Sequence, residues 1–99
     1  MLFLRKQYFA AIRNGTKTTT IRFWRYPMVR VGSVEAVRGL GKLTIEAVEE
    51  ISFEALTAAD ARADGFADLG ALRAALAEHY PPEARAGKKL YRVRFAFVG

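Results

Sequence analysis

The stretch NGTKTTTIRFW, residues 14–24, combines strand-forming side chains with two cations. Threonine, isoleucine, phenylalanine and tryptophan favour β-strands, so a strand is expected over residues 18–25. Lys17 precedes this strand, and Gly15 allows the turn there because glycine adopts backbone conformations closed to other residues. We therefore expect Lys17 in the turn, beside the first residues of the strand.

Alternation along this strand separates two sets of side chains. Ile21 and Phe23 point one way and are expected to face the core. Thr20, Arg22 and Trp24 point the other way, either into solvent or into a cleft. Threonines and cations are also ordinary on a solvent-facing strand. Spacing alone leaves both interpretations open, but the cleft would bring an ammonium, a hydroxyl and a guanidinium to one place.

The rest of the chain predicts three more strands and three helices in a single domain, residues 1–99. The strand over residues 42–53 is expected to keep alternate residues from Leu43 to Ile51 on one face. Thr57 with Asp60 resembles a capping box, and Asp68 is a second helix cap. The order indicates a small, mostly antiparallel curved sheet or partly open barrel covered by helices. The expected helices cover residues 6–14, 57–64 and 69–80, and the other strands cover residues 33–38 and 90–98.

Composition excludes several classes of protein. The chain has 52% hydrophobic residues, no cysteine and one histidine, so disulfides and thiolate or histidine-rich metal sites are excluded. No cofactor is expected. The N-terminal apolar run is broken at Arg5, and no segment reaches the roughly 20 apolar residues of a membrane span. These features predict a cytoplasmic protein without a membrane partner, and they leave the oligomeric state open.

Charge is unevenly distributed along the chain. Residues 1–45 hold nine Lys or Arg and one acid, residues 46–83 hold nine acids and two Arg, and residues 84–99 hold five Lys or Arg and no acid. If the two ends meet in space, they form a basic face, which is typical of proteins that bind polyanions. A basic charge that serves only solubility is the alternative.

Two motifs resemble the ASCH domain family. GTKTTTIR, residues 15–22, fits the family signature G-x-K-x-x-T-x-R, and LTAADARADGF, residues 56–66, is similar to a second family stretch. The final strand YRVRFAF, residues 91–97, fits as well, so the resemblance covers nearly the whole chain. It implies an α+β, PUA-like fold, a small and mostly antiparallel β-barrel with flanking helices.

The resemblance implies binding of RNA or a modified nucleoside in a basic cleft. Lys17 and Arg22 would meet a phosphate or a base edge, and an aromatic side chain would stack on a base. The expected binding residues are Arg22, Trp24, Arg25, Tyr26 and Lys42.

A second class of function is implied by small bacterial members of the family, which act as amidohydrolases on N4-acetylcytidine. The corresponding catalytic residues here are Lys17, Thr20 and Asp64, although those members carry Glu where this chain has Asp64. Lys17 acts as a base only if its pKa is lowered by burial or by Arg22, because a nearby carboxylate raises it. Ribonuclease activity, known among ASCH relatives, ranks third because no histidine pair or acidic cluster supports it.

Overall fold

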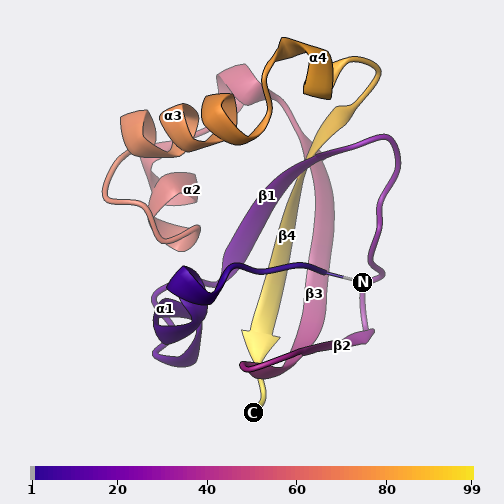
Figure 1. Ribbon diagram of the computed structural model, residues 1–99, viewed down its shortest axis with the longest axis vertical. Coiled ribbons are helices and arrows are strands. Elements are labelled where there is room, and N and C mark those ends of the chain that lie inside the picture. The colour runs from indigo at the N-terminus through magenta and orange to yellow at the C-terminus, as the bar shows by residue number, and fades with distance from the viewer. Residues whose placement is uncertain (1) are drawn as a thin grey trace.

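The computed structural model describes residues 2–99 as a four-stranded antiparallel sheet with helices around it (Figure 1). The strand order is β1-β4-β3-β2, with β1 Thr19–Trp24, β2 Val34–Val37, β3 Gly41–Ile51 and β4 Lys89–Phe97. The helices are η1 Lys6–Tyr8, α1 Phe9–Arg13, η2 Phe53–Ala55, α2 Ala58–Ala63, α3 Leu69–His79 and α4 Pro82–Arg85.

The expected β-barrel is wrong, because the sheet is open. β1 pairs only with β4, and β2 pairs only with β3, so these two strands are the edges of the sheet. β2 has only four residues and does not reach β1. The N-terminal segment, residues 2–8, runs across the sheet instead and covers part of it (Figure 1). The α+β class and the antiparallel pairing are as predicted.

β3 contains an irregularity that the alternation pattern did not predict. Its pairing with β4 steps from Ile45↔Phe95 to Ala47↔Arg94, so Glu46 has no partner in the register. Such a bulge reverses the side-chain alternation beyond it. As a result Val48, opposite Val93, packs against the same hydrophobic cluster as Ile45.

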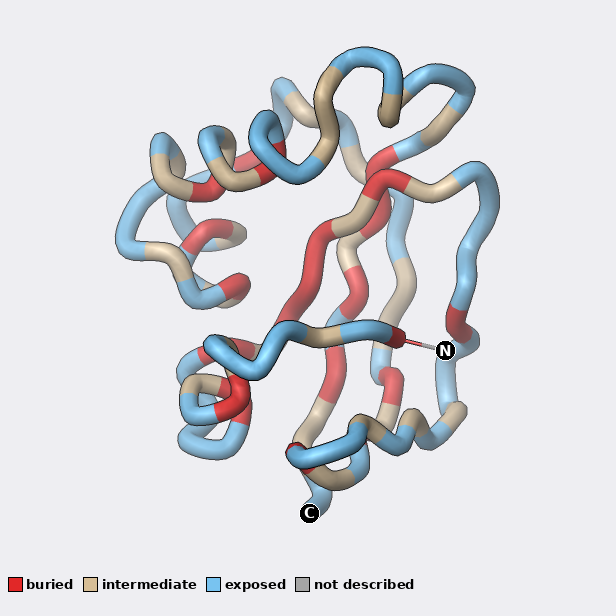
Figure 2. Tube along the Cα trace, viewed as in Figure 1, coloured by how far each residue is buried: buried red, intermediate tan, exposed pale blue. Residues whose placement is uncertain are grey.

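The core consists of two clusters of buried hydrophobic residues, which join the sheet to the helices. Buried residues follow the strands in Figure 2. Ile21 and Phe23 lie in the cluster under α2 and α3, as predicted. The cluster under α1 and the N-terminal segment contains Leu2, Phe9, Ile12, Val29, Leu40, Leu43, Ile45, Val93 and Phe95. The other contains Ile21, Phe23, Leu56, Ala61, Leu72, Leu76 and Leu90.

The predicted helix caps are confirmed. The Asp60 backbone N–H donates to Thr57 Oγ1 at 3.1 Å, and the Thr57 backbone N–H donates to Asp60 Oδ2 at 2.9 Å, which completes the capping box of α2. Asp68 Oδ1 accepts from the Ala71 N–H at 2.8 Å at the start of α3. The short helix α4 was not predicted. Within residues 2–99, no helix combines the length and apolar character needed to cross a membrane.

Candidate functional site

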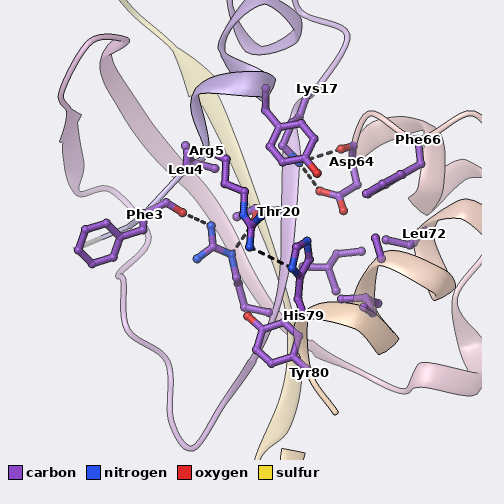
Figure 3. A pocket seen from close by; sticks show the side chains of 15 residues that line it. Phe3, Leu4, Arg5, Lys17, Thr20, Asp64, Phe66, Leu72, His79 and Tyr80 are labelled. Atoms are coloured by element: carbon purple, nitrogen blue, oxygen red, sulfur yellow. Dashed lines mark hydrogen bonds and ion pairs between the residues drawn. The ribbon is translucent and has the colours of Figure 1, made fainter. Parts of the chain in front are cut away.

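A cavity of about 500 Å³ lies between the N-terminal segment, the first half of β1, the end of α2 and α3 (Figure 3). Its wall combines aromatic rings and aliphatic side chains with a cluster of polar groups. The polar lining residues are Arg5, Tyr8, Lys17, Thr20, Arg22, Asp64, His79 and Tyr80. The structure thus brings Lys17, Thr20, Arg22 and Asp64 together from two segments about forty residues apart.

Lys17 occupies the turn directly before β1, and its side chain is 4% exposed. Two backbone hydrogen bonds place this turn: the Lys17 N–H donates to Ala11 O at 3.0 Å, and the Thr18 N–H donates to Ala63 O at 2.8 Å. The ammonium donates to Thr19 O at 2.7 Å, to Asp64 O at 2.8 Å and to Asp64 Oδ1. These three acceptors match the three protons of the ammonium.

Asp64 is the C-cap residue of α2, and the turn after it directs the chain back toward Lys17. The Gly65 N–H donates to Arg62 O at 3.0 Å and the Phe66 N–H donates to Ala61 O at 2.8 Å, which is a Schellman motif. Gly65 has a φ of 93°, a conformation that glycine adopts without strain. Gly65 therefore ends α2 directly after Asp64, the residue whose carboxylate contacts Lys17.

Burial dominates the electrostatics of this ion pair. It raises the pKa of Asp64 to about 6, although the Lys17 ammonium opposes the shift. Burial likewise lowers the pKa of Lys17, against the attraction of Asp64, and Arg22 lowers it further. The two pKa values move toward each other, so transfer of a proton from Lys17 to Asp64 costs less than it would in water.

Thr20 and Arg22 form a second polar pair in the cavity. Arg22 Nε donates to Thr20 Oγ1 at 3.0 Å, and Arg22 Nη2 donates to Phe3 O of the N-terminal segment. Thr20 is buried and Arg22 is half-buried. Burial lowers the pKa of Arg22. Because the guanidinium occupies an acceptor site of the hydroxyl, the hydroxyl proton is available for donation to a ligand.

The other predicted binding residues lie outside the cavity. Trp24 is half-buried and packs against Tyr91, with 5.9 Å between ring centroids. Arg25 and Tyr26 are exposed in the segment after β1, and Lys42 is exposed on β3, paired with Ala36 of β2. Their role in binding stays a prediction for a surface beyond this cavity.

Several lining residues were not among the predicted site residues. The Tyr8 ring lies 5.1 Å from Lys17 Nζ, and Phe66 follows the glycine that ends α2. His79 and Tyr80 stand at the end of α3, within the range where the sequence predicted only a helix. Of these residues, Phe66 is the one that a sequence motif could have indicated, because it ends the ASCH-like stretch of residues 56–66.

The two basic parts of the chain come together because β1 pairs with β4. Acidic residues of β3 and α2, however, form ion pairs with the basic side chains of β4. The sequence-based expectation of a basic face separate from the acidic residues is therefore wrong along this strand. The ion pairs are Lys89–Glu50 at 3.6 Å, Arg92–Glu49 at 3.3 Å, Arg92–Asp60 at 2.7 Å and Arg94–Glu46 at 3.5 Å.

The fold is similar to that of a solved ASCH domain. One similar solved structure is the ASCH domain from Lactobacillus crispatus JV V101, with a TM-score of 0.78 and 16% identity, covering 97% of this chain and 76% of that chain. Another is the hypothetical protein PH0355, with a TM-score of 0.78 and 15% identity, covering 96% of this chain and 94% of that chain. The chain therefore has an ASCH-like fold, as its motifs predicted.

No protein-family model matches the chain, and no protein of curated function matches it in sequence.

Proposed function

We propose that this protein binds a modified nucleoside in the cavity between β1, α2 and α3. The observation that carries the proposal is the cavity itself, whose volume of about 500 Å³ is typical of small-molecule sites. Tyr8, Phe66 and Tyr80 supply aromatic surface for a base, and Thr20 and Arg22 supply hydrogen-bonding groups for its edge or its sugar.

A single nucleoside fits these observations better than an extended RNA strand. RNA binding depends on cations that neutralise successive phosphates. Along β4, Lys89, Arg92 and Arg94 are already paired with carboxylates. Polar side chains of β1, the end of α2 and the N-terminal segment converge instead on one cavity.

Calorimetric titration with N4-acetylcytidine tests this proposal. We expect saturable one-to-one binding that changes little with salt, because the nucleoside is uncharged. Arg22→Gln should weaken binding at least about tenfold, which corresponds to the loss of a charge-assisted hydrogen bond. Arg38→Gln is the matched control, since Arg38 is exposed and does not line the cavity. Absence of nucleoside binding, with steeply salt-dependent binding of single-stranded RNA, would refute the nucleoside proposal.

A second candidate function, amide hydrolysis of an N4-acylated cytidine, is favoured by the Lys17–Asp64 pair. Its opposed pKa shifts lower the cost of forming a neutral amine next to a carboxylic acid from the ion pair. In this reaction Thr20 Oγ1 attacks the acyl carbon while neutral Lys17 accepts the hydroxyl proton. Protonated Asp64 then gives its proton to the departing amine as the C–N bond breaks. Water hydrolyses the acyl-threonine ester, which releases acetate and restores the hydroxyl.

Acetate release from N4-acetylcytidine distinguishes hydrolysis from binding alone. We expect Thr20→Val and Lys17→Met to lower turnover by at least about a hundredfold, the usual contribution of a nucleophile or base. Thr16→Val is the control, because Thr16 is exposed and outside the cavity. Tight binding of N4-acetylcytidine without acetate release would remove the hydrolase candidate and leave the binding function.

A further inference from the structure

Two guanidinium groups at the cavity have no carboxylate partner among residues 2–99. Arg22 donates to Thr20 Oγ1 and Phe3 O, and Arg5 Nη2 donates to Nδ1 of His79 at 3.0 Å. All three acceptors are uncharged, since a His79 nitrogen that accepts a hydrogen bond carries no proton.

The remaining charges of the cavity do not compensate these two cations. Lys17 and Asp64 neutralise each other in their buried ion pair. Arg5 and Arg22 therefore leave an excess positive charge on a cavity wall. Burial lowers the pKa of Arg22 most; Tyr80 and Asp64 raise it, and Arg5 lowers it through repulsion between the two guanidinium groups. A half-buried guanidinium with neutral partners only is unfavourable, and an anion placed between the two groups would relieve both effects.

Position distinguishes the two arginines. Arg22 lies on β1 beside Thr20, whereas Arg5 is exposed and belongs to the N-terminal segment that borders the cavity (Figure 3). An anionic group bound by both would lie beside the N-terminal segment, while the aromatic rings of the cavity contact the rest of the ligand. Guanidinium groups recognise phosphate through paired charge-assisted hydrogen bonds.

We propose that Arg5 and Arg22 form a phosphate subsite, so that the cavity takes a nucleoside 5′-monophosphate in preference to the free nucleoside. The nucleoside part rests on the proposed function, whereas phosphate recognition rests on the two guanidinium groups. Arg5 acts as a specificity determinant, because it is an exposed lining residue contributed by the N-terminal segment.

Calorimetry with three probes tests the subsite: N4-acetylcytidine, its 5′-monophosphate and inorganic phosphate. We expect the monophosphate to bind at least about tenfold more tightly than the nucleoside, in line with added charge-assisted hydrogen bonds. Arg5→Gln should reduce the affinity for the monophosphate to that for the nucleoside, because it removes one of the two guanidinium groups assigned to the phosphate. Arg38→Gln should preserve the preference.

The outcomes separate the subsite from the proposed function. Equal affinity for nucleoside and monophosphate in the unmodified protein, or an equal loss of both in Arg5→Gln, would overturn the subsite alone. Inorganic phosphate binding that Arg5→Gln removes, without any nucleoside binding, would support the subsite and overturn the proposed function. Absence of binding by all three probes would overturn both.

Discussion

Lys17 and Asp64 lie 47 residues apart in the chain and form a buried ion pair, with the Lys17 ammonium also donating to the main-chain oxygen of Asp64 at 2.8 Å. This contact joins the turn before β1 to the end of α2 and forms part of the cavity wall (Figure 3). Both segments carry an ASCH-like motif, so the pair connects the two sequence features on which the proposed site depends.

The pair makes stability depend on pH in a defined direction. In the unfolded chain Asp64 loses its proton near its ordinary value of 3.8, whereas in the folded protein burial raises its pKa to about 6. Between these values the folded state holds more protons, so Asp64 contributes stability below pH 4 that is lost as pH rises through 6.

Asp64→Asn isolates this effect because asparagine does not titrate. The unfolding free energy of the unmodified protein minus that of the variant should fall by about 2 kcal/mol between pH 4 and pH 7, from a two-unit pKa shift. Urea denaturation at several pH values measures the difference. A difference that grows with pH would show that the ion pair, and not burial, governs Asp64.

Gly65→Ala should destabilise the protein by about 1–2 kcal/mol, the cost of a left-handed conformation for a residue with a Cβ. The atoms nearest to an added Cβ belong to the Lys17 side chain, at ordinary contact distances from 3.5 Å, so the cost comes from the backbone at φ 93°.

Gly70→Ala is the matched control for this prediction. Gly70 lies in α3 without a positive φ, and alanine favours helix by up to about 1 kcal/mol. Thermal unfolding should therefore rank Gly70→Ala at or above the unmodified protein and Gly65→Ala below it. Equal stability of the two variants would argue against strain at Gly65.

Thr57→Ala removes the cap of α2 and should lower the unfolding free energy by about 1 kcal/mol. Thr57 is exposed, and its side chain serves only the capping box. Since Asp64 is placed at the opposite end of the helix, ligand affinity should remain within about twofold of the unmodified protein. Chemical denaturation and calorimetry on the same variant check both parts. A large loss of affinity would mean that α2 moves as a unit when its first turn is weakened.

Local chemistry made much of the fold predictable. Thr57 and Asp68 mark the helix starts, Gly65 marks a helix end, and the alternation of Ile21 and Phe23 marks the buried face of β1. Each of these signals involves residues a few positions apart, where side-chain hydrogen bonding and backbone preference act directly. The placement of Lys17 in the turn before β1 follows from the same kind of local argument.

Features that depend on distant pairing were not predictable in this way. The sheet is open because β1 and β2 do not pair with each other, and Glu46 is unpaired because the register between β3 and β4 shifts there. Both features depend on which distant strands pair. The contact between Arg5 and His79 spans 74 residues. No local pattern encodes these juxtapositions, so Arg5, Tyr8, His79 and Tyr80 were found as lining residues only in the structure.

The most direct test of the proposed site is an NMR titration of the ¹⁵N-labelled protein with N4-acetylcytidine. We predict saturable shifts of the backbone amides of Lys17, Thr20, Arg22 and Phe66, with little change at Lys42 or elsewhere at the far end of β3. Shifts confined to residues outside the cavity, or no shifts at millimolar nucleoside, would contradict the claim that this cavity binds a nucleoside.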